Sequence, residues 1–356
     1  MLTKPDCRAY LPPEWAEQSG VMLTWPHDRG DWGMHLPGVE KVFVELATAI
    51  SRFETCLVVC RDEGHRQSIQ SSLNRASPDR LVYAIADSND IWARDHGPLT
   101  VTCQNEPLLL NFRFNGWGGK YRADLDNAIV PTLFKQGHFG ETAIEDVDLV
   151  FEGGAIEVDG SGSFLATRHS VVTDTRNPGK DQGAIESILA DRLGIERFLW
   201  LEHGALEGDD TDGHIDTLAR FANRETILYC HCDDKSDSQF DDLNWMHAEL
   251  QSLVSATGEP YELVPLPLPA PKFDEDGHRL PATYANFLII NDAVLVPTYR
   301  DAKDGVVLDI MRRVFPDREV IGIDCLPLVQ QYGSLHCATM QLPRGIQIQN
   351  SGLGQQ

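Results

Sequence analysis

One cysteine, one histidine and three carboxylates stand out in this 356-residue sequence, because together they could attack a carbon centre and hold a cation. They are Cys337, His214, Glu152, Asp95 and Asp216. A thiolate is a nucleophile, and an imidazole can assist it and then protonate a leaving group. Each residue lies just before or at the start of a predicted hairpin. The sequence therefore predicts that they occupy equivalent places in a repeated unit.

Cys337 lies in the segment GSLHCATMQ. A free thiol, with a pKa near 8.5, needs a nearby cation to ionise, and a buried small hydrophobe is the alternative reading of a lone cysteine. His336 is adjacent, but in a strand it would point to the opposite face, so we expect a structural role for it. In DGHID, a strand would place His214 and Asp216 on one face. His214 is therefore the predicted partner of Cys337.

The carboxylates indicate the kind of substrate. Glu152 precedes two glycines in FEGGAIEVDG, and Asp95 lies in WARDHGP, where it could also simply pair with Arg94. Three carboxylates beside a cysteine would oppose thiolate formation and offer nothing to a peptide carbonyl. They suit a guanidinium, whose planar N–H donors match carboxylates in bidentate geometry. A bound cation would also favour the thiolate.

The elements that must position these residues recur along the chain. Hairpin patterns repeat at intervals of roughly 60 residues, which is typical of repeat architectures. Helical patterns lie between them, at 38–53, 180–194, 240–258 and 302–315. We expect an α/β fold whose units close into a ring, with the strand at 20–26 pairing with the last unit. An ordinary three-layer α/β domain is the alternative.

Composition favours a soluble protein with a cationic ligand. The net charge is −24, from 54 acidic and 30 basic residues, which disfavours nucleic acid and anionic membranes as partners, although acidity could serve solubility alone. No apolar run reaches membrane-spanning length, and no signal peptide is evident. Eight scattered cysteines indicate mostly free thiols. We expect one catalytic domain over 1–356, located in the cytoplasm, and the sequence is compatible with a homo-oligomer.

Two segments resemble metal sites but do not fit one. GDDTDGHID looks like a calcium loop, yet Gly208 and Ala219 fall where the first and twelfth ligands belong. CHC at 230–232 is too tightly spaced for the usual zinc pattern, so Cys230 and Cys232 are predicted to be packed strand side chains. We expect no metal and no organic cofactor.

Three aromatic residues are candidates for contacts with the rest of the substrate. Trp92 and Trp117 could line an apolar pocket wall, and core packing is the alternative. The fourth unit brings no charged residue to the centre, but strand alternation would put Tyr284 and Asn286 on the face that borders the pocket. Tyr284 is therefore predicted to contact the substrate's tail.

Seven motifs in order resemble the agmatine deiminase family, within the guanidino-group-modifying superfamily. They are LPPEW, WPHDRGDW, NDIWARDHGP, NFRFNGWGG, EGGAIEVDG, DGHID and GSLHC. The resemblance covers essentially the whole chain and implies a five-bladed α/β propeller, or pentein, with pseudo-fivefold repeats. The family also includes bacterial peptidylarginine deiminases. The chain length and the absence of an evident signal peptide favour agmatine as the substrate.

The resemblance implies a role for each residue. Cys337 matches the nucleophile, His214 the general acid/base and Glu152 the carboxylate that orients the histidine. Asp95 and Asp216 match the guanidinium anchors. The expected reaction converts agmatine to N-carbamoylputrescine and ammonia through a thiouronium on Cys337. Peptidylarginine deimination, amidino transfer and simple cation binding are the alternatives, although binding alone would not need the cysteine and the histidine.

Two departures from the family pattern border the pocket. The chain has YGSLHCATMQ where members commonly have GGNIHCITQQ, and His96 where they commonly have Ser or Thr. The residues assigned to the chemistry are unaffected, whereas the identity of the substrate is less firmly implied.

Overall fold

Four of the six sheets in the computed structural model, which describes residues 8–350, share one topology. In each, an antiparallel pair is extended by a parallel third strand. Their strands are β4 (Leu99–Cys103), β5 (Glu106–Arg113) and β6 (Ala143–Val150); β7 (Glu157–Val158), β8 (Ser163–Thr167) and β9 (Arg197–Leu201); β10 (Ala219–Phe221), β11 (Thr226–His231) and β12 (Glu262–Pro267); and β15 (Leu288–Ile290), β16 (Ala293–Thr298) and β17 (Glu319–Asp324).

A fifth sheet joins the two ends of the chain. Its order is β18 (Thr339–Pro343), β1 (Gln18–Thr24), β2 (Thr55–Cys60) and β3 (Leu81–Ile85). β1 runs antiparallel to β18, where Met22 is opposite Met340, and parallel to β2. The antiparallel-then-parallel order of the other four sheets is thus repeated here. The sixth sheet is a small ribbon of β13 (Lys272–Phe273) and β14 (Arg279–Leu280).

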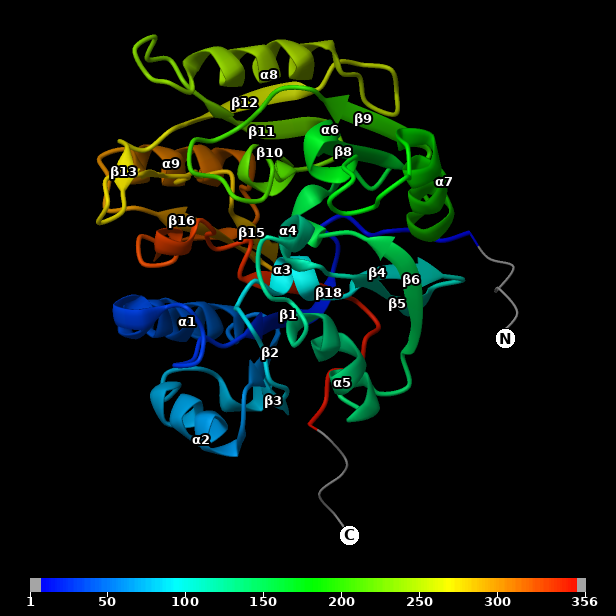
Figure 1. Cartoon of the computed structure of the whole chain (residues 1–356), viewed down its shortest axis with the longest axis vertical. Helices are drawn as coiled ribbons and strands as arrows, with labels where there is room; N and C mark the ends of the chain where they lie inside the picture. Colours follow the sequence, from blue (N-terminus) through cyan, green and yellow to red (C-terminus); the bar gives the residue numbers. More distant parts are fainter. Residues whose placement is uncertain (1–7, 351–356) are drawn as a thin grey trace.

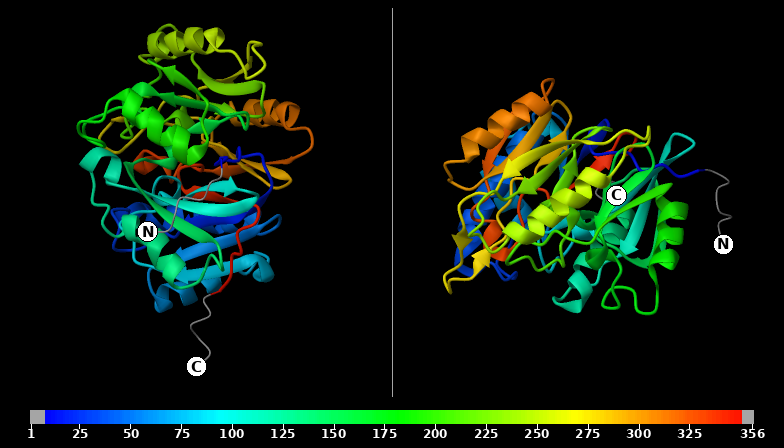
Figure 2. Two further views of the ribbon diagram at one scale, coloured as in Figure 1. Left: turned by 90° about the vertical axis from the view of Figure 1, so that its right-hand side faces the viewer. Right: turned by 90° about the horizontal axis from the view of Figure 1, so that it is seen from above.

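The longer helices lie toward the outside, and the short helix α3 (Ala93–His96) lies near the middle of the view in Figure 1. The α-helices are α1 (Leu36–Ile50), α2 (Glu63–Ser72), α4 (Gly116–Gly119), α5 (Ile129–Lys135), α6 (Arg168–Val171), α7 (Gln182–Leu193), α8 (Phe240–Ser252) and α9 (Asp304–Val314). The 3-10 helices are η1 (Gly33–His35), η2 (Pro78–Arg80), η3 (Asp126–Ala128), η4 (Gly153–Ala155), η5 (Ile215–Thr217) and η6 (Val329–Gln331). The other views also place α7 and α8 at the periphery (Figure 2).

Local sequence explains the best-defined helix ends. The Asp181 carboxylate caps α7 by accepting a hydrogen bond from the amide of Ala184. The helix stops at Gly194, which adopts the left-handed conformation, with φ 73°. Between these ends, α7 buries Ile185 and Leu189 against the sheets. The helix predicted at 180–194 is thus confirmed, with both ends explained by their capping residues.

The α/β class is confirmed, and the other predicted helices match α1, α8 and α9. The strand prediction fails at 168–171, which forms α6, and at the two functional segments around His214 and Tyr284, which form η5 and a turn. Within residues 8–350 the sheets are separate and none closes on itself, so the five-bladed ring stays a prediction.

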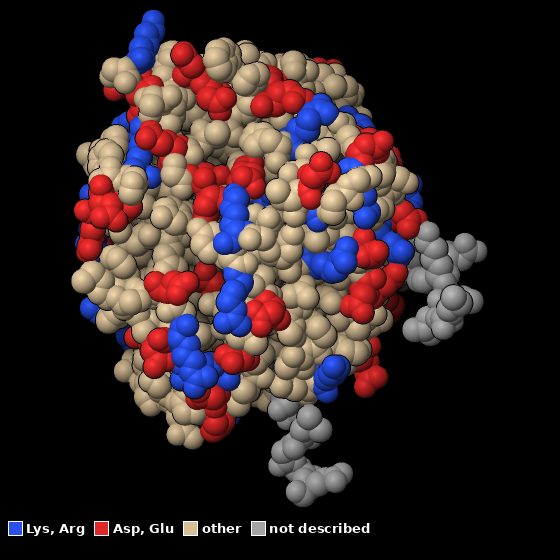
Figure 3. Space-filling model, in the orientation of Figure 1, with Lys and Arg blue, Asp and Glu red and all other residues tan. Residues whose placement is uncertain are grey.

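The surface charge and the state of the cysteines agree in part with the predictions made from composition. Acidic and basic side chains are interspersed over the face drawn in Figure 3. Six cysteines are free and buried, as predicted, whereas Cys103 is disulfide-bonded and Cys7 lies outside the described residues. Across the described part of the chain, every helix is too short or too polar to cross a membrane.

Candidate active site

The five residues predicted to carry the chemistry are all buried and are linked by contacts. Asp95 belongs to α3, Glu152 precedes η4, His214 and Asp216 flank the start of η5, and Cys337 lies in the turn before β18. None of them is more than 4% exposed. Each is held by a tight turn or a short helix rather than by a strand. The sequence-based assumption of strand alternation is therefore wrong, although the residues do come together.

The thiol of Cys337 lies among acidic and amide groups. Its Sγ is 3.6 Å from Oδ2 of Asp216 and 3.2 Å from the Nδ2 donor of Asn286. The amide oxygen of Asn286 accepts hydrogen bonds from the backbone amides of His336 and Cys337. Burial, together with Asp216 and Asp95, raises the pKa of the Cys337 thiol well above its ordinary value. These surroundings therefore favour the protonated form of the thiol.

His214 lies between two carboxylates. Its Nε2 is 3.4 Å from Oε2 of Glu152, and its Nδ1 is 3.6 Å from Oδ1 of Asp95. Burial opposes the charged ring, but Asp95 and Glu152 outweigh it and raise the pKa of His214 to about 9. The ring is consequently an imidazolium at neutral pH and can act as a proton donor.

Glu152 is held from its other side by a buried arginine. Nε of Arg176 donates to both carboxylate oxygens of Glu152, at 2.7 and 3.0 Å, while its other nitrogens reach Asp212 and the backbone oxygen of Thr211. Burial alone would raise the pKa of Glu152, but His214 and Arg176 together lower it. Glu152 is therefore an anion with a fixed orientation. Arg176 carries no sequence signal that pointed to this role.

Asp95 is fixed by two donors. The indole Nε1 of Trp117 donates to its Oδ2 at 2.9 Å, and the amide of Gly154 donates to its Oδ1 at 2.9 Å. Burial is the main cause that raises the pKa of Asp95 to about 6, and His214 counteracts it. No residue with a side chain fits at position 154, since a Cβ on Gly154 would lie 2.6 Å from Nδ1 of His214. This close approach explains one glycine of the FEGGA segment.

Asp216 presents one free oxygen to the centre of the site. Its Oδ2 contacts Nδ1 of His336 at 2.7 Å and Nδ2 of Asn286 at 3.2 Å. Its Oδ1 is buried and has no hydrogen-bond partner in the described structure, and the same is true of Nδ1 of His214. Burying a carboxylate oxygen without a hydrogen-bond partner costs free energy. This arrangement therefore suits a ligand whose cationic group donates a hydrogen bond to that oxygen.

His336 corrects a prediction. It does not point away from the site, because residues 335–338 form a turn rather than a strand. Its Nδ1 contacts Asp216, and its Nε2 contacts Oε2 of Glu14 at 2.6 Å. Burial would raise the pKa of Asp216, but the hydrogen bond and charge of His336 lower it. His336 therefore belongs to the site.

The three aromatic candidates differ in the residues that they contact. Trp117 contacts Asp95 directly, as described above. Trp92 is buried against Trp32, and a Cβ at Gly333 would lie 2.3 Å from its ring, so Trp92 supports the turn that carries Cys337. The hydroxyl of Tyr284 donates to Oδ1 of Asp304 at 2.7 Å, which leaves its contact with a substrate tail a prediction.

A second acidic group lies next to Trp92. Burial is the main cause that raises the pKa of Asp90 to about 7, with Asp31 and Asp210 adding to it. Burial and Asp209 likewise raise the pKa of Asp210 to about 6. A cavity of about 280 Å³ at this place is lined by Arg29, Gly30, Asp31, Asp87, Ser88, Asn89, Asp90, Tyr121, Arg122 and Leu125. The lining combines Asp31, Asp87 and Asp90 with Arg29 and Arg122, so it carries charges of both signs.

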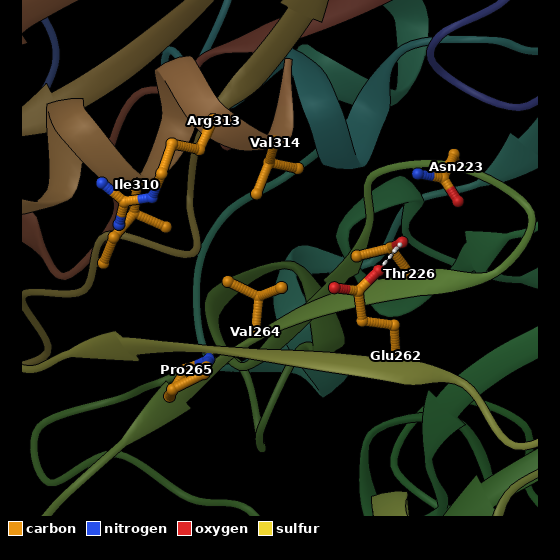
Figure 4. Close-up of a pocket in the computed structure, with 8 residues that line it drawn as sticks. All are labelled: Asn223, Thr226, Glu262, Val264, Pro265, Ile310, Arg313 and Val314. Atoms are coloured by element: carbon orange, nitrogen blue, oxygen red, sulfur yellow. Dashed lines mark hydrogen bonds between the residues drawn. The ribbon is translucent and has the colours of Figure 1, made fainter. Parts of the chain in front are cut away.

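Other cavities and clusters contain none of the predicted residues. A surface pocket of about 410 Å³ between β12 and α9 is lined by aliphatic, amide and charged side chains such as Val264, Glu262 and Arg313 (Figure 4). Asp274, Asp276 and His278 lie close enough to share an ion, but Asp276 and His278 are exposed on a hairpin turn. Cys230 and Cys232 are both buried in the core, as predicted for packed side chains.

The chain is similar to known proteins over nearly its whole length. The model of the Porphyromonas-type peptidyl-arginine deiminase family matches residues 10–343. A Porphyromonas gingivalis structure, provisionally named an arginine deiminase, is 49% identical, with a TM-score of 0.89 over 95% of this chain and 99% of that one. The C. jejuni agmatine deiminase, solved as a cysteine-to-serine variant with substrate bound, is 33% identical, with a TM-score of 0.89 over 97% and 99%.

Curated sequences give the same result. A protein from Shewanella sp. (strain MR-4), provisionally named an agmatine deiminase, is 30% identical over 97% of both chains. The relatives thus share hydrolytic deimination of guanidino compounds as their named activity, and the resemblance noted in the sequence is confirmed. The chain belongs to the Porphyromonas-type peptidyl-arginine deiminase family.

Proposed function

We propose that this protein is an agmatine deiminase, which hydrolyses agmatine to N-carbamoylputrescine and ammonia. The observation that carries the proposal is the buried, unpaired Oδ1 of Asp216, whose other oxygen, Oδ2, lies 3.6 Å from the sulfur of Cys337. A guanidinium would satisfy this oxygen and place its central carbon near the sulfur. The two anchors, Asp95 and Asp216, would hold the planar group in one orientation, which lowers the barrier for attack.

The first half-reaction forms the covalent intermediate. The bound cation favours loss of the thiol proton from Cys337 to solvent, because its charge offsets the two neighbouring carboxylates. The thiolate attacks the guanidinium carbon and forms a C–S bond. The imidazolium of His214 donates the proton on Nδ1 to the departing nitrogen, the C–N bond breaks, and ammonia leaves. Cys337 then carries a thiouronium, and His214 is neutral.

The second half-reaction uses water. Neutral His214 accepts a proton from a water molecule at Nδ1 while the oxygen attacks the thiouronium carbon. The C–S bond then breaks, the hydroxyl oxygen loses its remaining proton to solvent, and the neutral ureide leaves. The sulfur is again a thiolate, and the ring is again an imidazolium. Glu152, fixed by Arg176, keeps the ring oriented in both steps. His214 supplies the proton that ammonia needs and accepts one from water, while the remaining protons go to solvent.

The acids near Trp92 support agmatine over arginine. Burial raises the pKa of Asp90 to about 7 and that of Asp210 to about 6. An amine at the far end of the substrate would favour the ionised form of both acids, whereas they would repel the carboxylate of free arginine. Peptidyl-arginine is the second candidate, because the matching family is named for that activity. Its backbone carries no charge there, so the acids favour it less than they favour an amine.

The architecture is part of the same proposal. We propose that the five like sheets form a five-bladed propeller within a single catalytic domain. The strand β1 supports this, since it joins β18 from the end of the chain to β2 from its start. The four helices and turns that carry the site residues come from different units, as convergence on a common axis requires.

Ammonia release from agmatine, free arginine and a blocked arginine peptide tests the function. We expect agmatine to exceed arginine by at least ~10²-fold in kcat/KM, because burying an unpartnered carboxylate costs several kcal/mol. A higher kcat/KM on the peptide would assign peptidylarginine deimination instead. Release from none of the three would reject both assignments.

A further inference from the structure

Hydrogen bonds connect Asp216 to His336 and His336 to Glu14, and the proposed reaction assigns no role to His336 or Glu14. We propose that Glu14, His336 and Asp216 form a relay in which a protonated His336 keeps Asp216 ionised and fixes its free oxygen toward the substrate. The role of Asp216 in this inference rests on the proposed function. Glu14 and His336 are positioning residues, since they act through Asp216.

Two short contacts connect the three side chains of the relay in series. Nδ1 of His336 contacts Oδ2 of Asp216 at 2.7 Å, and Nε2 contacts Oε2 of Glu14 at 2.6 Å. All three side chains are buried: His336 is 1% exposed, Asp216 is fully buried, and Glu14 is 8% exposed. Water therefore competes little for these contacts, and the two carboxylates are held further by Asn286, which donates to Asp216, and by Arg220, which pairs with Glu14.

The protonation of His336 follows from its two partners. Carboxylate oxygens only accept hydrogen bonds, so both ring nitrogens must donate, and only an imidazolium carries a proton on each. Burial raises the pKa of both carboxyl groups, but Arg220 and Arg94 lower the pKa of Glu14, and His214 and Arg220 lower the pKa of Asp216, so charges other than His336 favour both anions. The relay thus holds one positive charge between two negative ones.

Other charged groups surround this relay. They are Arg94 and Asp95 of α3, Glu157 of β7, His214 before η5, Arg220 of β10 and Cys337. Arg220 pairs with Glu14 at 3.0 Å and with Glu157, so it balances the carboxylates on the side away from the substrate. Among these groups, His336 is the one whose charged ring donates a hydrogen bond to Oδ2 of Asp216. The other carboxylate oxygen of Asp216, Oδ1, is the one left without a partner.

Removing His336 should therefore make substrate affinity depend on pH. Without its proton donor, buried Asp216 becomes easier to protonate as the pH falls, and a neutral Asp216 binds a cation poorly. In a Cys337→Ser background, we expect His336→Gln to weaken agmatine binding by at least ~10-fold near pH 6, with a smaller loss near pH 8.5. Isothermal titration calorimetry across this range measures the ratio between the variant and its parent.

A matched control separates this effect from a general loss of packing. His138 is also 1% exposed, and it contacts Gln136 and the backbone oxygen of Gln349. His138→Gln should leave agmatine affinity within about twofold of the parent at every pH. An identical loss at every pH for His336→Gln, or no loss at all, would overturn the relay.

A second measurement needs no substitution at His336 and no substrate. In protein labelled with 15N in its histidine rings, NMR should show both nitrogens of His336 protonated near pH 7.5, whereas an ordinary exposed histidine is neutral there. A neutral His336 ring would overturn the proposal even if His336→Gln failed to fold. If the Cys337→Ser parent does not bind agmatine, the proposed function fails, while the NMR result still decides the relay.

Discussion

The sulfur of Cys337 lies 3.6 Å from the carboxylate of Asp216, a partner that opposes the thiolate required for attack. If Cys337 is the nucleophile, as we propose, it depends on the cation that it attacks, because a bound guanidinium would neutralise Asp216. We therefore expect the thiol to resist oxidation and alkylation without substrate and to become reactive when the substrate binds.

Removing the charge of Asp216 should therefore activate the free thiol. Since this carboxylate raises the pKa of Cys337, Asp216→Asn should lower it and increase the thiolate fraction. We expect at least ~10-fold faster alkylation by iodoacetamide at pH 8, because one pKa unit is a tenfold change in thiolate. The rate is measured by mass spectrometry of the Cys337 peptide, with Cys337→Ser as the blank. Slower alkylation than in the wild type would contradict this assignment.

The pH profile of kcat/KM should be bell-shaped. Asp95 must be ionised to bind the cation, and its pKa of about 6 sets the acid limb. His214 must be protonated to release ammonia, and its pKa of about 9 sets the alkaline limb. Activity is therefore expected to fall below about pH 6 and above about pH 9 in steady-state assays with agmatine. An alkaline limb near pH 7 would show that His214 is not held between two carboxylates.

Arg176 should matter for both stability and catalysis. Its removal leaves Glu152 buried without a charge partner, which typically costs about 3–5 kcal/mol. We expect Arg176→Ala to lower the free energy of unfolding by that order and kcat/KM by at least ~10²-fold, measured by urea denaturation and ammonia release. Arg192, which pairs with Glu145 and is partly exposed, is the control, since Arg192→Ala should cost about 1 kcal/mol or less.

Gly154 should tolerate no side chain. A methyl group there would meet Nδ1 of His214 at 2.6 Å and Oδ1 of Asp95 at 2.8 Å. Gly154→Ala is expected to lower kcat/KM by at least ~10²-fold, because a displacement of this size disturbs both the proton donor and an anchor. Gly305 in α9 has no atom within 4 Å of a Cβ, so Gly305→Ala should keep full activity. Equal activity of the two variants would argue against the site as drawn.

The sequence predicted the principal residues better than their local structure. His214 and Asp216 were placed on one face by strand alternation, yet they lie at the start of η5, where a tight turn brings both to the centre. Helix α2 was not predicted, because Ile69 is its one buried residue among those described and no apolar stripe results. Periodicity detects elements that bury a regular face, and functional segments rarely do.

The supporting residues could not be predicted for a different reason. Arg176 acts on Glu152 from 24 positions away, and Glu14 reaches His336 across 322 positions, so only the folded chain brings them together. Glu14 lay within a quoted motif, LPPEW, but nothing in that segment indicated its chemistry. Asn286 was noted beside Tyr284, and the structure reverses their importance, since Asn286 contacts the sulfur while Tyr284 bonds to Asp304.

The central claim is a covalent intermediate on Cys337, and rapid quenching during turnover of agmatine tests it most directly. Intact-protein and peptide mass spectrometry should show an adduct with the mass of agmatine less one ammonia, located on the peptide that contains Cys337. The adduct should be absent from Cys337→Ser, which should retain agmatine binding in calorimetry. Ammonia release by the wild type without any adduct, or turnover by Cys337→Ser above a few per cent of wild type, would contradict the mechanism.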